Sequence, residues 1–537
     1  MARAFAGIGS LALLSGAIFG QSAETPAPSF ESADVHVSAH SMRPYPTGGA
    51  VRGGRYDLRN ATMVDLIATA YGIEGEKVLG GPSWLETHRF DIIAKAPPAR
   101  SAETVQQMLQ ALLADRFKLV IHKDTKSLPG YSLTLGKGKP KLKEADGSGN
   151  SGCQPQQQNP EPGNVPYAMI ACRNVTMDDF ARDLRWMAGA YISKTVVDST
   201  ELKGAWDFDI KWTARALLAK AGADGITIFD AVDKELGLKL ESQMVPIAVI
   251  VVDSVNQKPT ENPPGVVEKL PAPPPAEFEV ADIKPSAPGE RPGFMVPPGG
   301  RVNIQGFTLK RLIRIAWDIN SDELLAGEPK WLDTDRFSIV AKAATNGPSP
   351  DVDFDDIRLM LQALLADRFK LATHTEDRDV TAYTLVAVKP KLTQADPLSR
   401  TGCKEGPAPG AKDPRDANPV LTRLVTCQNI TMAQFAEKLQ SLASGYLHVP
   451  VVDATGMDGA WDFTLNFSPV QIFRDAGVRV GDSAQPVSAT PAAASDPNGA
   501  LSVFDAISKQ LGLKLEMHKR QVPVLVIDHV EPKPTEN

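Results

Sequence analysis

A duplication is the sequence feature that most constrains the fold of this chain. The run LQALLADRFKL at residues 109–119 recurs without change at residues 361–371, and both copies close on Pro-Thr-Glu-Asn, at Pro259 and Pro534. Motifs that return in the same order over most of a sequence indicate repeated structural units. The second copy is longer, mainly through an insertion at residues 470–499 that is rich in Ala, Pro, Ser and Asp.

The repeat divides the chain into two modules. A chain of 537 residues is too long for a single hydrophobic core. We therefore predict a first module over residues 24–262 and a second module over residues 278–537. Residues 263–277 between them contain runs of proline, which are typical of a semi-rigid linker.

The N-terminus has the pattern of an export signal. Arg3 precedes an apolar stretch at residues 4–19, and small residues follow before the polar segment that begins at Glu24. This pattern predicts a signal peptide over residues 1–23 and a periplasmic or secreted protein. An uncleaved anchor is the less favoured alternative, because the apolar stretch is short for a membrane span of about 20 residues.

The four cysteines fall as one pair in each copy, Cys153 with Cys172 and Cys403 with Cys427. An even number of cysteines in an exported protein indicates disulfides, and the duplication favours pairing within each copy. Zinc binding is the competing interpretation. It is weak, because neither pair has the Cys-x-x-Cys spacing or the neighbouring histidines of a zinc site.

Helical and strand patterns alternate within each module. Apolar residues at helical and at alternating spacing give the order helix, strands, helix, strands, twice per module. In the first module we expect short strands at residues 117–122, 131–135, 238–240 and 245–252. Helices packed on small mixed sheets give an α+β fold, with two similar units per module and four in the chain.

Several of these motifs also carry a family resemblance. The stretch GGPSWLETHRFDIIAKA from Gly80, FEVADIKPS from Phe278, LLADRFKL and the terminal Pro-Thr-Glu-Asn resemble a family of uncharacterised exported proteins of acidobacteria and other soil bacteria, a domain of unknown function. Most members carry one copy, so the tandem arrangement is a departure. In some relatives the domain is fused to an antibiotic-sensor-type membrane metallopeptidase, whose His-Glu-x-x-His motif is absent here.

The resemblance implies no activity that transfers to particular residues. The order of elements is also similar to that of the short N-terminal domains of secretins and TonB-dependent receptors, which implies an envelope interaction module. This second comparison rests on element order alone, so it is an analogy.

Four side chains are candidate binding residues. His122 and His374 occupy equivalent positions after the repeated Asp-Arg-Phe-Lys-Leu run, which is compatible with a general base or a ligand. A polar residue at the solvent side of a strand is the favoured interpretation of both. Trp84 and Trp331 also recur, and such aromatics can anchor a peptide or carbohydrate. Core packing is the favoured interpretation of these tryptophans.

Two further repeated acidic motifs have structural interpretations. We expect Asp115-Arg116 to form a helix-end turn in which the arginine meets carbonyls of the last helical turn, and the same for its repeat in the second module. Asp198 and Asp453 each follow a Val-Val strand and precede a threonine, which predicts Asx turns.

The net charge and the absence of known catalytic motifs restrict the classes of function that the sequence supports. A net charge of -7 argues against nucleic acid as a partner, and the sequence has no Walker loop, no dinucleotide fingerprint and no Gly-x-Ser-x-Gly. We expect no cofactor and no metal. We predict a non-catalytic envelope module that binds a protein, a peptide or a cell-wall ligand. A hydrolase with dispersed histidine and carboxylate residues, and a sensory accessory to an envelope protease, are the alternatives.

Overall fold

The computed structural model describes residues 28–39, 45–97, 101–156, 165–273, 276–297, 299–319, 321–343, 354–397, 399–408, 411–418, 420–475 and 499–535. The predicted signal peptide, at residues 1–23, lies outside the described residues, as does most of the insertion in the second copy. Within the described ranges, no helix is long and apolar enough to cross a membrane.

The first unit of the first module is an antiparallel sheet with two helices on one face. Its strands, in order across the sheet, are β1 (Ser32–Val37), β5 (Arg89–Lys95), β3 (Arg55–Thr62) and β2 (Thr47–Arg52). The helices are α1 (Met63–Tyr71) and α2 (Ala102–Arg116). Thr62 caps α1 through a capping box, as its position before the apolar run predicts, and Gly72 ends the helix in the left-handed conformation.

The second unit is a second antiparallel sheet. Its strands, in order, are β7 (Lys143–Glu144), β11 (Trp206–Thr213), β9 (Tyr167–Val175) and β8 (Gly152–Pro155). Its helices are α3 (Met177–Met187), α4 (Leu218–Ala221) and α5 (Ile228–Leu236). The disulfide Cys153–Cys172 joins β8 to β9, which confirms the pairing expected from the sequence.

A long ribbon connects the two units and corrects the strand prediction. The four short strands expected in this part of the module are two continuous ones, β6 (Val120–Leu135) and β12 (Leu238–Ser254), which pair antiparallel along their length. The short strands β10 (Val196–Asp198) and β4 (Val78–Gly80) flank them in parallel. The middle of β6 is polar because it is largely exposed, and that composition resembles a loop in the sequence.

The second module repeats this plan. Its first sheet has β13 (Phe278–Pro285), β17 (Arg336–Ala343), β15 (Arg301–Thr308) and β14 (Gly293–Met295), with α6 (Leu309–Ala316) and α7 (Phe354–Arg368). The ribbon is β18 (Ala372–Ala387) and β24 (Leu513–His529), flanked by β22 (Val451–Asp453) and β16 (Leu325–Ala326). Its last sheet has β19 (Thr393–Gln394), β23 (Trp461–Phe467), β21 (Arg423–Ile430) and β20 (Gly402–Glu405), with α8 (Met432–Leu442), α9 (Val470–Asp475) and α10 (Val503–Ala506).

The α+β class and the two-module organisation are confirmed, with one correction to the sheets. The sheets of the units are purely antiparallel, and only the ribbons are mixed. Each unit has its own hydrophobic core. Phe117 and Phe369, from the identical repeated run, are fully buried at equivalent places. The second disulfide, Cys403–Cys427, joins β20 to β21.

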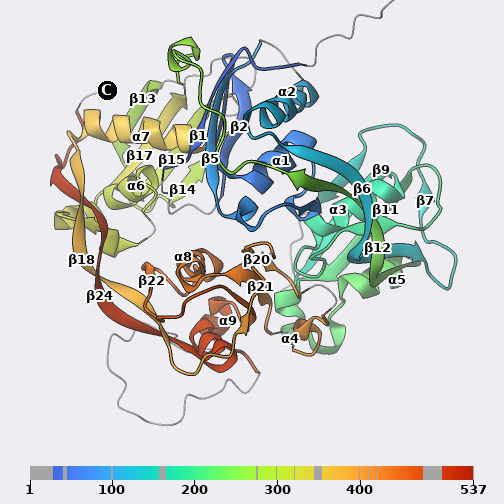
Figure 1. Cartoon of the computed structure of the whole chain (residues 1–537). Helices are drawn as coiled ribbons and strands as arrows, with labels where there is room; N and C mark the ends of the chain where they lie inside the picture. The colour runs from blue at the N-terminus through green and yellow to red at the C-terminus, as the bar shows by residue number, and fades with distance from the viewer. Residues whose placement is uncertain are drawn as a thin grey trace, which may run out of the picture.

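The two modules pack closely against each other. The second ribbon, β18 with β24, carries the chain from the first sheet of its module to the last, so that β20 and α8 lie next to the first module (Figure 1). Arg400 Nη2 donates to the carbonyl oxygen of Gly80 at 2.8 Å. A second contact joins Arg52 to Asp356 at the start of α7, with 2.7 Å between Nη1 and Oδ2.

Candidate functional site

The two candidate histidines lie on the exposed faces of the ribbons. His122 Nδ1 is 2.9 Å from Asp253 Oδ1 on the opposite strand, and His374 Nδ1 is 2.8 Å from Asp528 Oδ1. Both imidazoles are about half exposed, at 51% and 48%. Neither histidine lines either of the two cavities described below. Each therefore forms a His–Asp pair on an open ribbon.

The second of these pairs has a measurable consequence. The hydrogen bond that His374 donates to Asp528, together with the nearby Glu376, raises the pKa of His374 above its ordinary value of 6.5. We expect an NMR titration midpoint above 6.5 for His374, and a lower midpoint in Asp528→Asn. A raised folded-state pKa stabilises the fold below the unfolded-state pKa, and this contribution is lost as pH rises through the folded-state value. A midpoint unchanged by Asp528→Asn would contradict the assignment.

The two candidate tryptophans pack against the cores of the first units. Trp84 is partly buried, with its ring 6.3 Å from that of Phe90 and 5.8 Å from that of His88. Trp331 packs at the equivalent place in the second module. This packing is the interpretation that the sequence favoured for both residues. Their use as ligand anchors stays a prediction.

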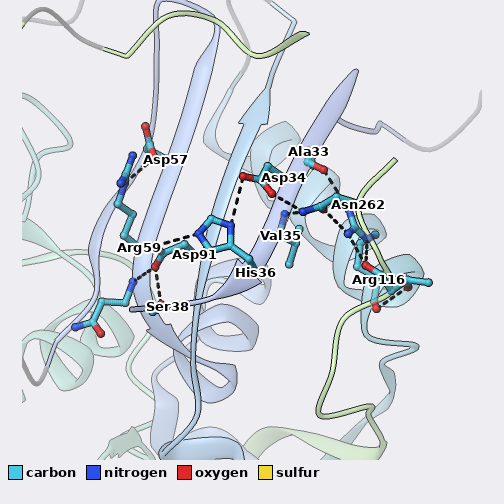
Figure 2. A network of polar contacts seen from close by, with 12 residues as sticks. Ala33, Asp34, Val35, His36, Ser38, Asp57, Arg59, Asp91, Arg116 and Asn262 are labelled. Carbon is cyan, nitrogen blue, oxygen red and sulfur yellow. Dashed lines mark hydrogen bonds and ion pairs between the residues drawn. The ribbon is translucent and has the colours of Figure 1, made fainter. Parts of the chain in front are cut away.

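Arg116 belongs to a network that closes the first module (Figure 2). Its guanidinium is buried and donates to the carbonyl oxygens of Thr260 and Ala33 and to Asn262 Oδ1. Asn262 Oδ1 also accepts from the amide of Val35, at 3.0 Å. The arginine therefore holds the Pro-Thr-Glu-Asn motif against β1. The prediction that it meets carbonyls of its own helix was wrong, because the returning tail supplies the carbonyls.

The same network continues across the outer face of the first sheet. His36 lies between Asp34 and Asp91, with nitrogen–oxygen distances of 3.3 and 3.6 Å (Figure 2). Asp91 also accepts from the hydroxyl of Ser38 and from the amide of Asn60. These contacts tie β1, β5 and β3 together. In the part of the chain that the structure describes, no group of three His, Cys, Asp or Glu side chains is placed to hold a metal ion.

A polar cavity of about 490 Å³ lies where the two modules meet. The first module contributes α1, η1 (Gly75–Lys77), η2 (Ser83–Glu86) and the end of α3, and the second contributes β20 and α8. Three separate units therefore form its walls. A site of this kind depends on the tandem arrangement, because neither module encloses it alone.

Glu86 is the centre of the contact beside this cavity. Its side chain is 15% exposed, and Oε1 accepts from Arg400 at 3.2 Å and from Lys404 at 3.4 Å. Burial lowers the pKa of Arg400, and the neighbouring Glu86 carboxylate opposes that shift. On the facing wall, Arg185 holds Glu74 and Glu76 at 3.0 and 2.5 Å. Arg185 and Lys404 thus have carboxylate partners, and Arg89 donates to the carbonyl oxygen of Asn60.

Lys438, on α8, is the exception. Its side chain lines the cavity and has no hydrogen bond or ion pair with any described residue. Burial lowers the pKa of Lys438, Glu86 acts in the opposite direction, and Arg89 lowers it further. The lysine is therefore a partly desolvated ammonium group that faces a cavity and lacks a partner.

Sequence reasoning missed this site, although one signal pointed to it. The modules differ in charge where the cavity forms. Lys438 stands where the first module has Asp183, and Arg400 stands where it has Asn150. A change of charge between repeats marks positions that the two copies use differently. No motif connects these residues, because they meet only when the modules pack together.

The comparisons with known proteins agree with the repeat. The family model described as "Protein of unknown function (DUF3738)" matches residues 64–255 and residues 310–530. No curated protein and no solved structure matches the chain. The two matched regions fall in the two modules and together cover more than half of the sequence. The chain belongs to the family of proteins of unknown function DUF3738 and carries its domain in two copies.

Proposed function

We propose that this chain is a non-catalytic binding protein whose ligand site is the cavity between its modules. The observation that carries the proposal is the unpartnered ammonium of Lys438 in that cavity. A cation that has lost part of its hydration gains strongly from a charge-assisted hydrogen bond, because leaving it unpaired is costly. An anionic group on a ligand supplies that partner.

The other charges of the cavity favour a single carboxylate over a phosphate. Asp65, Glu74, Glu76 and Glu405 also line its walls, and they repel a group with two negative charges. A ligand that carries one carboxylate next to its own hydrogen-bonding amide groups suits such a mixed surface better than a phosphate does. The free C-terminus of a peptide has this chemistry, and a cell-wall peptide and a protein tail are both sources of it.

The predicted export of the chain supports an envelope role for such a binding protein. The N-terminal pattern predicts a signal peptide, and a disulfide in each module is compatible with an oxidising compartment outside the cytoplasm. The ligand we propose is therefore met in the periplasm or outside the cell.

The hydrolase alternative rests on the His–Asp pairs of the ribbons. A general base needs a substrate or an activated water within hydrogen-bonding reach. His122 and His374 are exposed and lie away from the cavity on which the binding proposal rests. The cavity therefore favours binding over hydrolysis.

Calorimetric titration with trialanine tests the binding proposal. We expect saturable binding of the peptide with a free carboxylate, and about tenfold weaker binding by Lys438→Met, which corresponds to about 1.4 kcal/mol. The C-terminally amidated peptide is expected to bind the native protein as weakly as trialanine binds the variant. Equal affinities for the free and the amidated peptide would overturn the proposal.

A matched lysine on the second ribbon controls for a general loss of charge. Lys514 lies on β24, pairs with Glu516 at 3.0 Å and does not line the cavity. Lys514→Met removes the same charge and is expected to bind trialanine as the native protein does. An equal loss of affinity in Lys514→Met would mean that the peptide is attracted by overall charge.

A further inference from the structure

The two modules dock through surfaces that are different on each side. The first module offers a turn at residues 80–86, which we name the docking turn. The second offers residues 400–405 along β20, which we name the edge surface. Arg400 donates to the Gly80 carbonyl oxygen at 2.8 Å, and the amide of Thr401 donates to that of Ser83 at 3.4 Å. Such a heterologous contact leaves one unused copy of each surface in the chain.

The unused edge surface, at residues 150–155 of the first module, has an open place for a carboxylate. In the second module, a Cβ added to Gly402 would lie 2.3 Å from Glu86 Oε2, so the carboxylate rests directly on the glycine. At the equivalent Gly152, an added Cβ would meet nothing within 4 Å. A cavity of about 470 Å³, lined by Gly152 and its neighbours, occupies this place.

The open place has one cation, which comes from a different strand and is already paired with a carboxylate. Arg400 and Lys404 are replaced by Asn150 and Gln154 in the first module. The cross-strand partner of Gly152 is Arg173, which also lines the cavity. Its side chain is 51% exposed and holds Asp209 at 2.8 Å. Asp209 lines the cavity as well, so an approaching carboxylate would share the Arg173 guanidinium with it. The amide side chains that line the cavity would supply the other polar contacts.

The unused docking turn, at residues 327–333 of the second module, supplies a matching carboxylate. Its η7 (Lys330–Asp333) is equivalent to η2, and Asp333 stands in the place of Glu86. Asp333 is 57% exposed, whereas Glu86, which is in contact with the other module, is 15% exposed. Lys310 is shared by Asp333, Glu328 and Asp322, and the Asp333 carboxylate stays accessible to a further partner despite this contact.

We propose that the chain associates head to tail with a second copy of itself. The docking turn of one copy's second module binds the edge surface of the other copy's first module. Asp333 rests on Gly152 beside Arg173, as Glu86 rests on Gly402 within one chain. Because each chain has one free surface of each kind, the contact can be repeated from chain to chain. This association is independent of the proposed ligand cavity.

Sedimentation velocity over a concentration series tests this association. The contact is small and polar, so we expect weak association that becomes visible towards about 1 mM, where a Kd of that size corresponds to about 4 kcal/mol. Asp333→Lys is expected to abolish it. Asn150→Arg combined with Gln154→Lys restores the two cations of the second module and is expected to lower the Kd at least tenfold.

Either of two other results would overturn the proposal. One is a protein that stays monomeric over the whole series and remains so with Asn150→Arg and Gln154→Lys. Another is association that persists unchanged in Asp333→Lys, which would place the contact on a different surface. Both variants change exposed side chains, so loss of folding is not expected to obscure the result.

Discussion

Replacing Arg116 with methionine is expected to destabilise the first module by about 3 kcal/mol. Methionine preserves much of the apolar stem but donates no hydrogen bonds, and the carbonyl oxygens of Thr260 and Ala33 then lose a charged donor. Asn262 loses its contact with the guanidinium as well. The tail of the module should therefore detach from β1 before the sheet unfolds.

Amide hydrogen exchange is the appropriate measurement, because a chain of several units has no single free energy of unfolding. Two amides report on the tail: that of Val35, which donates to Asn262, and that of Thr260, which donates to the Arg116 carbonyl oxygen. Both are expected to lose protection in Arg116→Met. Asp115→Asn is the control, since the side chain of this neighbour is 72% exposed and forms its ion pair with Lys118. Unchanged protection in Arg116→Met would contradict the role given to the network.

The parts of the fold that were predictable from the sequence are those set by local chemistry. Thr62 and Gly237 stand at the ends of apolar helical patterns, and both act as the caps that those positions predict. Asp198 and Asp453 form the expected Asx turns, with threonine amides donating to their carboxylates at 2.9 and 2.8 Å. Each of these interactions joins residues only a few positions apart.

The long ribbons were not predictable in the same way. The middle of β6 pairs with the strand that returns more than 100 residues later, for example Lys126 with Ile247. Its exposed polar residues show no alternation against a core, so the pattern that defines a half-buried strand is missing there. The partner strand is more apolar, with Val245, Ile247 and Val249 buried, but pairing at this distance leaves no local signal.

The proposed ligand cavity was not predictable from the sequence either, because its residues come together only in the folded chain. The sequence directed attention to the histidines and tryptophans that recur in both modules. Residues that recur mostly serve the common fold, as Trp84 does in the core of its unit. A site between two unlike surfaces instead depends on residues that differ between the copies, such as Lys438 and Asp183. The functional effect of such a difference can be recognised only when the packing of one module on the other is known.

Variants that lack one or the other disulfide can distinguish the packing between the modules from the stability of a single module. Each closes a loop, with sequence separations of 19 and 24 residues, so each is expected to contribute about 3 kcal/mol to its own module. Only Cys403–Cys427 anchors the strand that docks on the first module. Replacing this pair with alanines is therefore expected to free β20 and to release the Thr401 amide from Ser83.

The equivalent double alanine variant of Cys153 and Cys172 is the matched control. It should lower the stability of the first module by a similar amount, because the loop and the strand pair are equivalent. Under native conditions, exchange at the Thr401 amide is expected to rise only in the variant that lacks Cys403 and Cys427. Trialanine binding should weaken in the same variant, since β20 forms a wall of the cavity. If both variants released the Thr401 amide equally, the contact would depend on overall stability and not on the edge strand that carries it.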